Sequence, residues 1–242
     1  MYANIRTASA LIAISYISLL SGCNKEQCSI EQRNALNNQS VQNYANPDRW
    51  KAVIQKFVDN DKKNPPPKNA VLFVGSSSIR MWDTSKWFPD IPNINRGFGG
   101  SYVIDSYIYA DQIITPYKPR TIVFYAGDND AADKKPPQMV LADFEALFFK
   151  VRKELPKTKI VVISTKPSIA RWKFWPQMLE ANNYIEIFCK KQQNTAFVDV
   201  SKVMLDSAGQ PRKDIFLSDG LHLNEKGYEL WTSLVKPLII NE

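Results

Sequence analysis

The chain has 242 residues, enough for one medium-sized domain with a buried core, and its excess of Lys and Arg over Asp and Glu gives a net charge of +7. The basic residues are dispersed and no recognition motif accompanies them, so the charge does not indicate a nucleic-acid-binding protein. The single histidine and three cysteines do not have the spacing of a zinc site, and we expect neither a metal nor a cofactor.

Residues 1–22 have the pattern of a secretory signal peptide. One positive charge, Arg6, precedes an apolar stretch from Ala8 to Leu20 that is short for a membrane span. The stretch ends in Leu20-Ser21-Gly22-Cys23, which resembles the bacterial lipobox and implies lipidation of Cys23. The alternative is a plain signal peptide whose last cysteine has no function. We therefore expect a protein of the bacterial cell envelope, lipid-anchored to the membrane on the periplasmic face or the surface.

Residues 23–46 are predicted to be a flexible tether between this anchor and a domain over residues 47–242. The tether is rich in Asn, Gln and Ser and contains few large apolar residues. Cys28 lies in the tether and Cys189 in a predicted helix. The two could pair in an oxidising compartment, but because of these positions we expect that they do not.

The domain begins with a helix for which Asn46 is the expected N-cap and Pro47 the first residue, and this helix stops before Asn64-Pro65-Pro66-Pro67. Short apolar runs then alternate with helical patterns. In chain order we expect strand 70–74, strand 93–95, helix 102–114, strand 121–126, an amphipathic helix from Pro137 to about Leu155, strand 160–164, helix 177–191, strand 196–200 and helix 225–235. This rhythm predicts a five-stranded parallel sheet covered on both faces, a three-layer α/β/α fold.

Residues with useful chemistry follow the carboxyl ends of these strands, where open parallel sheets bind their ligands. Ser77 follows the first strand, Gly100 the second and Asn129 the third, while Asp219 and His222 come after the fifth. Acyl transfer by a serine needs a hydroxyl, a base, a group that fixes the tautomer of the base, and donors for the oxyanion. The chain has a candidate for each of these parts.

Each candidate also has a plain structural interpretation. Ser77 could cap a helix, Gly100 could form a tight turn, and Asn129 and Asp219 could be ordinary loop residues. His222 could be a structural histidine, but it is the only histidine in the chain, so a histidine-based mechanism has no other base. The D-x-x-H spacing can bring Asp219 to Nδ1 of His222 while Nε2 faces a nucleophile.

The order of four motifs resembles that of the SGNH hydrolase family, also called GDSL esterases and lipases, from about Ala70 to the C-terminus. The motifs are Gly75-Ser76-Ser77, Asn95–Gly100, Gly127-Asp128-Asn129-Asp130 and Asp219-Gly220-Leu221-His222. The resemblance implies a flavodoxin-like sheet in an SGNH hydrolase domain. It further implies Ser77 as nucleophile, His222 as general base and then acid, and Asp219 as the residue that orients His222.

The same resemblance implies an oxyanion hole made by the backbone N–H groups of Ser77 and Gly100 and the side chain of Asn129. Ser76 stands where the family usually has an aspartate, a difference that bears more on loop packing than on catalysis. Ser76 and Ser78 are alternative candidates for the reactive hydroxyl, but the alignment of the motif favours Ser77.

The resemblance thus implies a serine esterase that cleaves carboxylic esters through an acyl-enzyme. Short-chain acyl esters, lipids and acetylated glycans are all open as substrates, and the oligomeric state is not predicted. Aromatic and arginine side chains near the motifs could line the substrate site or pack beneath loops; those expected to line it are Arg80, Trp82, Arg171 and Trp172.

Two alternatives stay open at this point: an acyltransferase to a sugar or lipid hydroxyl, and a non-catalytic glycan-binding envelope lipoprotein. The absence of a G-x-S-x-G motif argues against an α/β-hydrolase.

Overall fold

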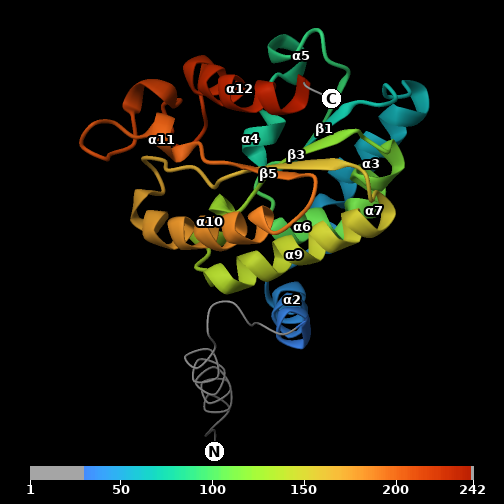
Figure 1. The fold of residues 1–242 in the computed structure, drawn as a ribbon, viewed down its shortest axis with the longest axis horizontal. Coiled ribbons are helices and arrows are strands. Elements are labelled where there is room, and N and C mark those ends of the chain that lie inside the picture. Colours follow the sequence, from blue (N-terminus) through green and yellow to red (C-terminus); the bar gives the residue numbers. More distant parts are fainter. Residues whose placement is uncertain (1–29, 241–242) are drawn as a thin grey trace, which may run out of the picture. The chain divides into compact units, whose positions relative to one another are not determined.

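The computed structural model describes residues 30–240, so the signal peptide, Cys23 and Cys28 lie outside the described residues. Five parallel strands form one sheet in the order β2-β1-β3-β4-β5 (Figure 1). The strands are β1 (Val71–Gly75), β2 (Asn93–Gly97), β3 (Thr121–Tyr125), β4 (Lys159–Ile163) and β5 (Thr195–Val198). The predicted parallel sheet is confirmed, and its strand order is that of flavodoxin-like folds.

Helices cover both faces of the sheet, which gives the expected three layers (Figure 1). One face carries α3 (Pro47–Lys63), α6 (Val103–Ile108), α7 (Ala110–Ile113), α9 (Pro137–Glu154) and α10 (Trp175–Lys190). The other face carries α4 (Ser77–Arg80), α5 (Thr84–Trp87), α11 (Ser201–Met204) and α12 (Glu225–Ile240). Short helical turns complete the connections: η1 (Thr115–Tyr117), α8 (Asp128–Ala132), η2 (Trp172–Phe174) and η3 (Lys213–Ile215).

Each face of the sheet has its own apolar core, because successive strand residues point to opposite sides. Leu72 and Val74 of β1 belong to the core beneath α9, whereas Phe73 belongs to the core beneath α12. All five residues of β1 are buried, as expected for a strand covered on both faces. The carboxyl end of β1 is therefore held between the strands β2 and β3 and between the two apolar cores.

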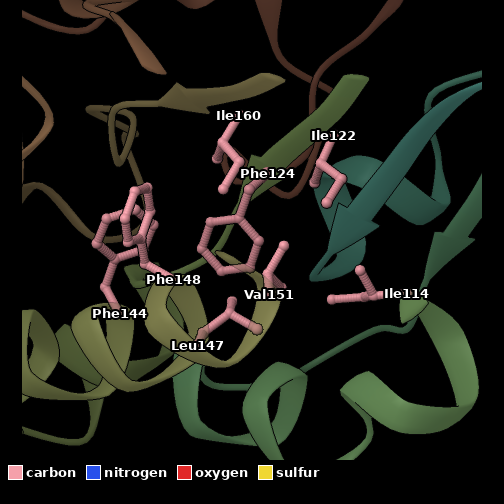
Figure 2. A pocket seen from close by; sticks show the side chains of 8 residues that line it. All are labelled: Ile114, Ile122, Phe124, Phe144, Leu147, Phe148, Val151 and Ile160. Atoms are coloured by element: carbon pink, nitrogen blue, oxygen red, sulfur yellow. The ribbon is translucent and has the colours of Figure 1, made fainter. Parts of the chain in front are cut away.

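The predicted amphipathic helix is α9, whose apolar stripe packs against β3 and β4. Figure 2 shows an apolar hollow at this contact, lined by Ile114, Ile122, Phe124, Phe144, Leu147, Phe148, Val151 and Ile160. None of these side chains is polar or titratable, so the hollow has no group that could perform chemistry.

The predicted helix 102–114 is two helices, α6 and α7, and Tyr109 lies between them with φ −93° and ψ 5°. Tyr109 is buried, and its hydroxyl donates to the carbonyl oxygen of Pro47 in α3. We attribute the break to this tertiary contact, because helical periodicity in the sequence carries no information about it.

The prediction of a flexible tether is wrong for residues 30–44, which form helix α2 (Ile30–Tyr44). Asn37 and Ser40 of α2 are buried and donate hydrogen bonds of 3.0 and 2.6 Å to the carboxylate of Asp143 in α9. Residues from Leu36 onward form one compact unit, so the domain begins earlier than residue 47. Helix α2 was not predicted because its sequence is polar. Hydrogen bonds, and not an apolar stripe, hold it on the domain.

Cys189 is a free thiol buried on α10. Among the described residues, no helix is both long and apolar enough to cross a membrane.

Candidate active site

Ser77 lies at the turn between β1 and α4. Gly75 ends the strand with φ +138°, and a Cβ on it would lie 1.8 Å from the carbonyl oxygen of Tyr125 in the neighbouring strand β3. Only glycine fits this turn without displacing the strand. Ser76 occupies the N-cap position, and Ser77 is the first residue of α4. The N–H of Ser77 therefore has no acceptor within the helix and can serve an oxyanion.

The side chains of Ser77, His222 and Asp219 form a continuous hydrogen-bonded chain. Ser77 Oγ is 3.0 Å from Nε2 of His222, and Nδ1 of His222 is 2.6 Å from Oδ2 of Asp219. This is the arrangement of a nucleophile, a base and a group that fixes the tautomer of the base. Ser76 and Ser78 are fully buried, whereas Ser77 is 8% exposed, so Ser77 is the hydroxyl that meets both the base and the solvent.

Asp219 is fixed by its own loop. Its Oδ1 accepts hydrogen bonds of 2.9 Å from the backbone N–H groups of both Leu221 and His222. The hydrogen bond from the His222 ring, followed by these two backbone bonds, lowers the pKa of Asp219 to about 2. The carboxylate is therefore ionised at neutral pH, although its side chain is 46% exposed.

The loop that carries Asp219 and His222 is anchored on both sides. Phe216 and Leu223 form an antiparallel bridge across its base, and Ala170 N–H donates to the carbonyl oxygen of Gly220. In the helix that follows the loop, the hydroxyl of Tyr228 donates to the carbonyl oxygen of Ser78 at 2.9 Å. This last contact joins the base-carrying segment directly to the turn that carries the nucleophile.

Gly100 follows β2 and Asn129 follows β3, the two strands that flank β1, and the segments after these strands are in contact. Asn129 Nδ2 donates a hydrogen bond of 2.9 Å to the carbonyl oxygen of Ser101, the residue after Gly100. Phe98 N–H donates to the carbonyl oxygen of Gly75, which keeps the segment after β2 next to the Ser77 turn. The structure thus brings together all five residues that the sequence nominated for catalysis.

The residues expected to line the substrate site have different placements. Arg80 is exposed beside Gly99, where a Cβ on the glycine would lie 3.0 Å from Arg80 Nε. Trp172 is half-buried and stacks on Trp175 with ring centroids 6.1 Å apart. The guanidinium of Arg171 contacts Asn129.

The prediction for Trp82 is wrong. This side chain is 1% exposed and lies in the core beneath α12, where its ring contacts Phe73, Phe88, Tyr228 and Trp231. Because α4 is only one turn long, the chain turns back at Trp82 and directs the indole into the core.

Two basic residues near the site were missed by sequence reasoning. Arg49 of α3 is exposed beside Gly100, where a Cβ on the glycine would lie 3.2 Å from its Nη2. Lys166 follows β4 and is almost completely buried, with Nζ 2.9 Å from Asp128 Oδ2. The position of Lys166, a basic residue soon after a buried strand, could have indicated that it lies near the site. No local sequence pattern indicates this for Arg49.

Comparison with known proteins supports the fold and the family. The model of the GDSL-like Lipase/Acylhydrolase family matches residues 83–230. This range contains Gly100, Asn129, Asp219 and His222 and begins after Ser77, so the placement of Ser77 rests on the turn geometry and its contact with His222. No curated protein matches the sequence.

Several solved structures share the fold at low sequence identity. A Streptococcus pneumonia protein named for platelet activating factor is 22% identical, with a TM-score of 0.70 over 84% of this chain and 98% of that chain. A GDSL-like lipase from Bacteroides thetaiotaomicron is 18% identical, with a TM-score of 0.67 over 76% and 95%. An acetylxylan esterase from Geobacillus stearothermophilus is 13% identical, with a TM-score of 0.59 over 72% and 96%.

Proposed function

The chain belongs to the GDSL-like lipase and acylhydrolase family, and on this premise we propose that it is a serine esterase that hydrolyses carboxylic esters through an acyl-enzyme. The observation that carries the proposal is the 3.0 Å contact of Ser77 Oγ with His222 Nε2, whose other ring nitrogen is held by Asp219. The five residues nominated for catalysis supply a nucleophile, a base and oxyanion donors at one edge of the sheet.

In the proposed reaction, Ser77 Oγ attacks the ester carbonyl while His222 Nε2 takes the hydroxyl proton. The N–H groups of Ser77 and Gly100 and the Nδ2 of Asn129 donate to the oxyanion of the tetrahedral intermediate. The intermediate collapses as His222 protonates the departing alcohol. Water then attacks the acyl-enzyme with His222 as base, which releases the carboxylic acid and restores Ser77.

Asp219 stays ionised throughout this cycle. Its pKa of about 2 means that it does not take the proton from His222 but stabilises the imidazolium electrostatically.

For the substrate, we propose an acetylated carbohydrate. The half-buried Trp172 follows directly after Arg171, which touches the oxyanion-hole residue Asn129, and its stack with Trp175 offers an aromatic surface to a sugar ring. One structural neighbour is an acetylxylan esterase, which agrees with this choice. Exposed Arg80 beside Gly99 is proposed to contact the same substrate.

The proposal is tested by hydrolysis of p-nitrophenyl acetate, p-nitrophenyl octanoate and an acetylated xylo-oligosaccharide by the purified protein. Ser77→Ala and His222→Ala should each lower kcat by more than about 10³-fold, because each removes a part that acts in concert with the others. Ser76→Ala is the matched control and should keep the wild-type rate. Wild-type rates in both Ser77→Ala and His222→Ala would overturn the assignment.

Two further measurements separate the alternatives. Product analysis with and without an acceptor alcohol distinguishes hydrolysis from acyl transfer to a sugar or lipid hydroxyl. A fluorophosphonate probe should label Ser77, whereas a glycan-binding protein without catalysis would give no adduct.

A further inference from the structure

We propose that Arg171 is a positioning residue that orients the side-chain amide of Asn129 in the oxyanion hole, and that the buried pair Lys166–Asp128 holds Arg171 in place. The inference rests on the proposed function, because it requires Asn129 to act as an oxyanion donor. It also gives Arg171 a different task from the substrate contact expected from the sequence.

The amide of Asn129 is held at both ends. Oδ1 accepts a hydrogen bond of 2.7 Å from Arg171 Nη2, and Nδ2 donates one of 2.9 Å to the carbonyl oxygen of Ser101. A guanidinium can only donate and a carbonyl can only accept, so both partners select the same orientation of the amide. The Nδ2 group has two hydrogens, and the Ser101 carbonyl uses one of them. The second hydrogen is left for the oxyanion.

An amide in the opposite orientation would place an acceptor oxygen where the reaction develops negative charge. The Ser101 carbonyl alone opposes this rotation through a single neutral hydrogen bond. Arg171 adds a charge-assisted hydrogen bond, which is about twice as strong as a neutral one. Its loss should therefore increase the share of molecules in which Asn129 cannot donate.

Arg171 is itself held by a buried carboxylate. Its Nη1 lies 3.4 Å from Oδ1 of Asp128, whose side chain is 3% exposed. The other oxygen of Asp128 accepts from Lys166 Nζ at 2.9 Å, and the lysine side chain is 1% exposed. Asp128 and Lys166 thus form a buried, hydrogen-bonded ion pair, and charge attraction without a hydrogen bond holds Arg171 beside it.

Lys166 extends the network to the nucleophile turn. Its Nζ also donates hydrogen bonds of 3.1 Å to the hydroxyls of Ser78 and Tyr125, and Ser78 is the residue after Ser77. The cluster therefore connects both sides of the reacting centre.

A double-mutant cycle on p-nitrophenyl acetate hydrolysis tests this role, using the whole protein as wild type, Arg171→Met, Asn129→Ala and the double variant. Asn129→Ala should lower kcat by about 10²–10³-fold, the usual effect of losing one oxyanion donor. Arg171→Met should lower kcat by a smaller factor, about 10–100-fold, and leave KM within about twofold. If Arg171 acts through Asn129, the double variant should be no slower than Asn129→Ala alone.

Two control variants distinguish misfolding of the protein from a loss of orientation of the Asn129 amide. Arg152→Met removes an arginine that bonds the carbonyls of Pro156 and Thr158 before β4, at the opposite end of the sheet, and should leave kcat unchanged. Arg171→Lys keeps the charge and should restore part of the kcat that Arg171→Met loses. Should Arg171→Met fail to fold, Arg171→Lys takes its place in the cycle.

Independent, multiplicative losses in the double variant would overturn the inference, as would a change in KM without a change in kcat. If Asn129→Ala and Ser77→Ala both kept wild-type rates, the proposed function itself would fail. A slow Asn129→Ala variant beside a fully active Arg171→Met variant would refute only the role of Arg171.

Discussion

The carboxylate of Asp219 holds Nδ1 of His222, and its side chain is partly exposed to water. Asp219→Asn should lower kcat by about 10²–10⁴-fold, since the neutral amide favours the wrong tautomer of His222 and cannot stabilise its cation. KM for p-nitrophenyl acetate should change little. A kcat within twofold of wild type would show that His222 does not need this partner.

The buried Asp105 should make the stability of the fold depend on pH. It is 1% exposed, and burial raises its pKa from 3.8 to about 6 despite hydrogen bonds from the Tyr102 N–H and Trp50 Nε1. A pKa raised on folding means that the folded protein binds the proton more tightly than the unfolded chain. Asp105 therefore destabilises the fold above its folded pKa, and this cost falls as the pH drops from 7 towards 4.

Between pH 7 and pH 5, wild type should gain about 1 kcal/mol more unfolding free energy than Asp105→Asn, which cannot titrate. Urea denaturation of both proteins at the two pH values measures this difference. Equal pH dependence in the two proteins would contradict the prediction.

Lys166 should be essential for stability as well as for the arrangement of the site. Lys166→Met leaves the buried Asp128 without its closest cation and should lower the unfolding free energy by about 3–5 kcal/mol. Adding Asp128→Asn removes the buried charge that has lost its hydrogen-bonded cation, so the double variant should be more stable than Lys166→Met. A further loss on adding Asp128→Asn, measured by urea denaturation, would argue against this pairing.

The sequence could nominate Ser77 and His222 because residue type and position after a strand are both local properties. It could not reveal the contact of Arg171 with Asn129, since this contact joins loops 42 positions apart. The prediction that Trp82 lines the substrate site was wrong for a related reason. Exposure depends on the direction in which the chain leaves α4, and hydropathy does not encode that direction.

At the scale of elements, the strands were predictable and α2 was not. Strands β1, β3 and β4 are mainly apolar because both faces of the sheet are covered, so their composition predicts their burial. Helix α2 is polar, and its side chains Asn37 and Ser40 bind Asp143 while Tyr44 contacts Tyr102. The helix thus packs on the domain through these three specific side chains.

Replacing both Asn37 and Ser40 by alanine should lower the unfolding free energy by about 2–4 kcal/mol, because Oδ1 of the buried Asp143 carboxylate would lose its hydrogen bond while Oδ2 keeps its contact with Lys135. Asn38→Ala is the matched control, since the neighbouring Asn38 is exposed, and it should change stability by less than about 0.5 kcal/mol. Thermal and urea unfolding measure both effects. Similar losses in the two variants would mean that helix propensity, and not contact with Asp143, is responsible.

At the scale of the whole molecule, attachment to the envelope stays a prediction, because the lipobox lies outside the described residues. In a bacterial host, the wild-type protein should incorporate labelled palmitate and fractionate with membranes. Cys23→Ser should do neither, since a serine cannot accept the thioether-linked lipid. A soluble wild-type protein without label would favour the plain signal peptide.

The contact between Ser77 and His222 spans 145 positions of the chain, from the first strand to the loop after the last one. Such distant pairings close late in folding, because the chain entropy must be given up before the contact forms. Ester hydrolysis during refolding should therefore lag behind the recovery of helical circular dichroism. For the same reason, a nascent chain on the ribosome should stay inactive until His222 has emerged and its loop has packed against the Ser77 turn.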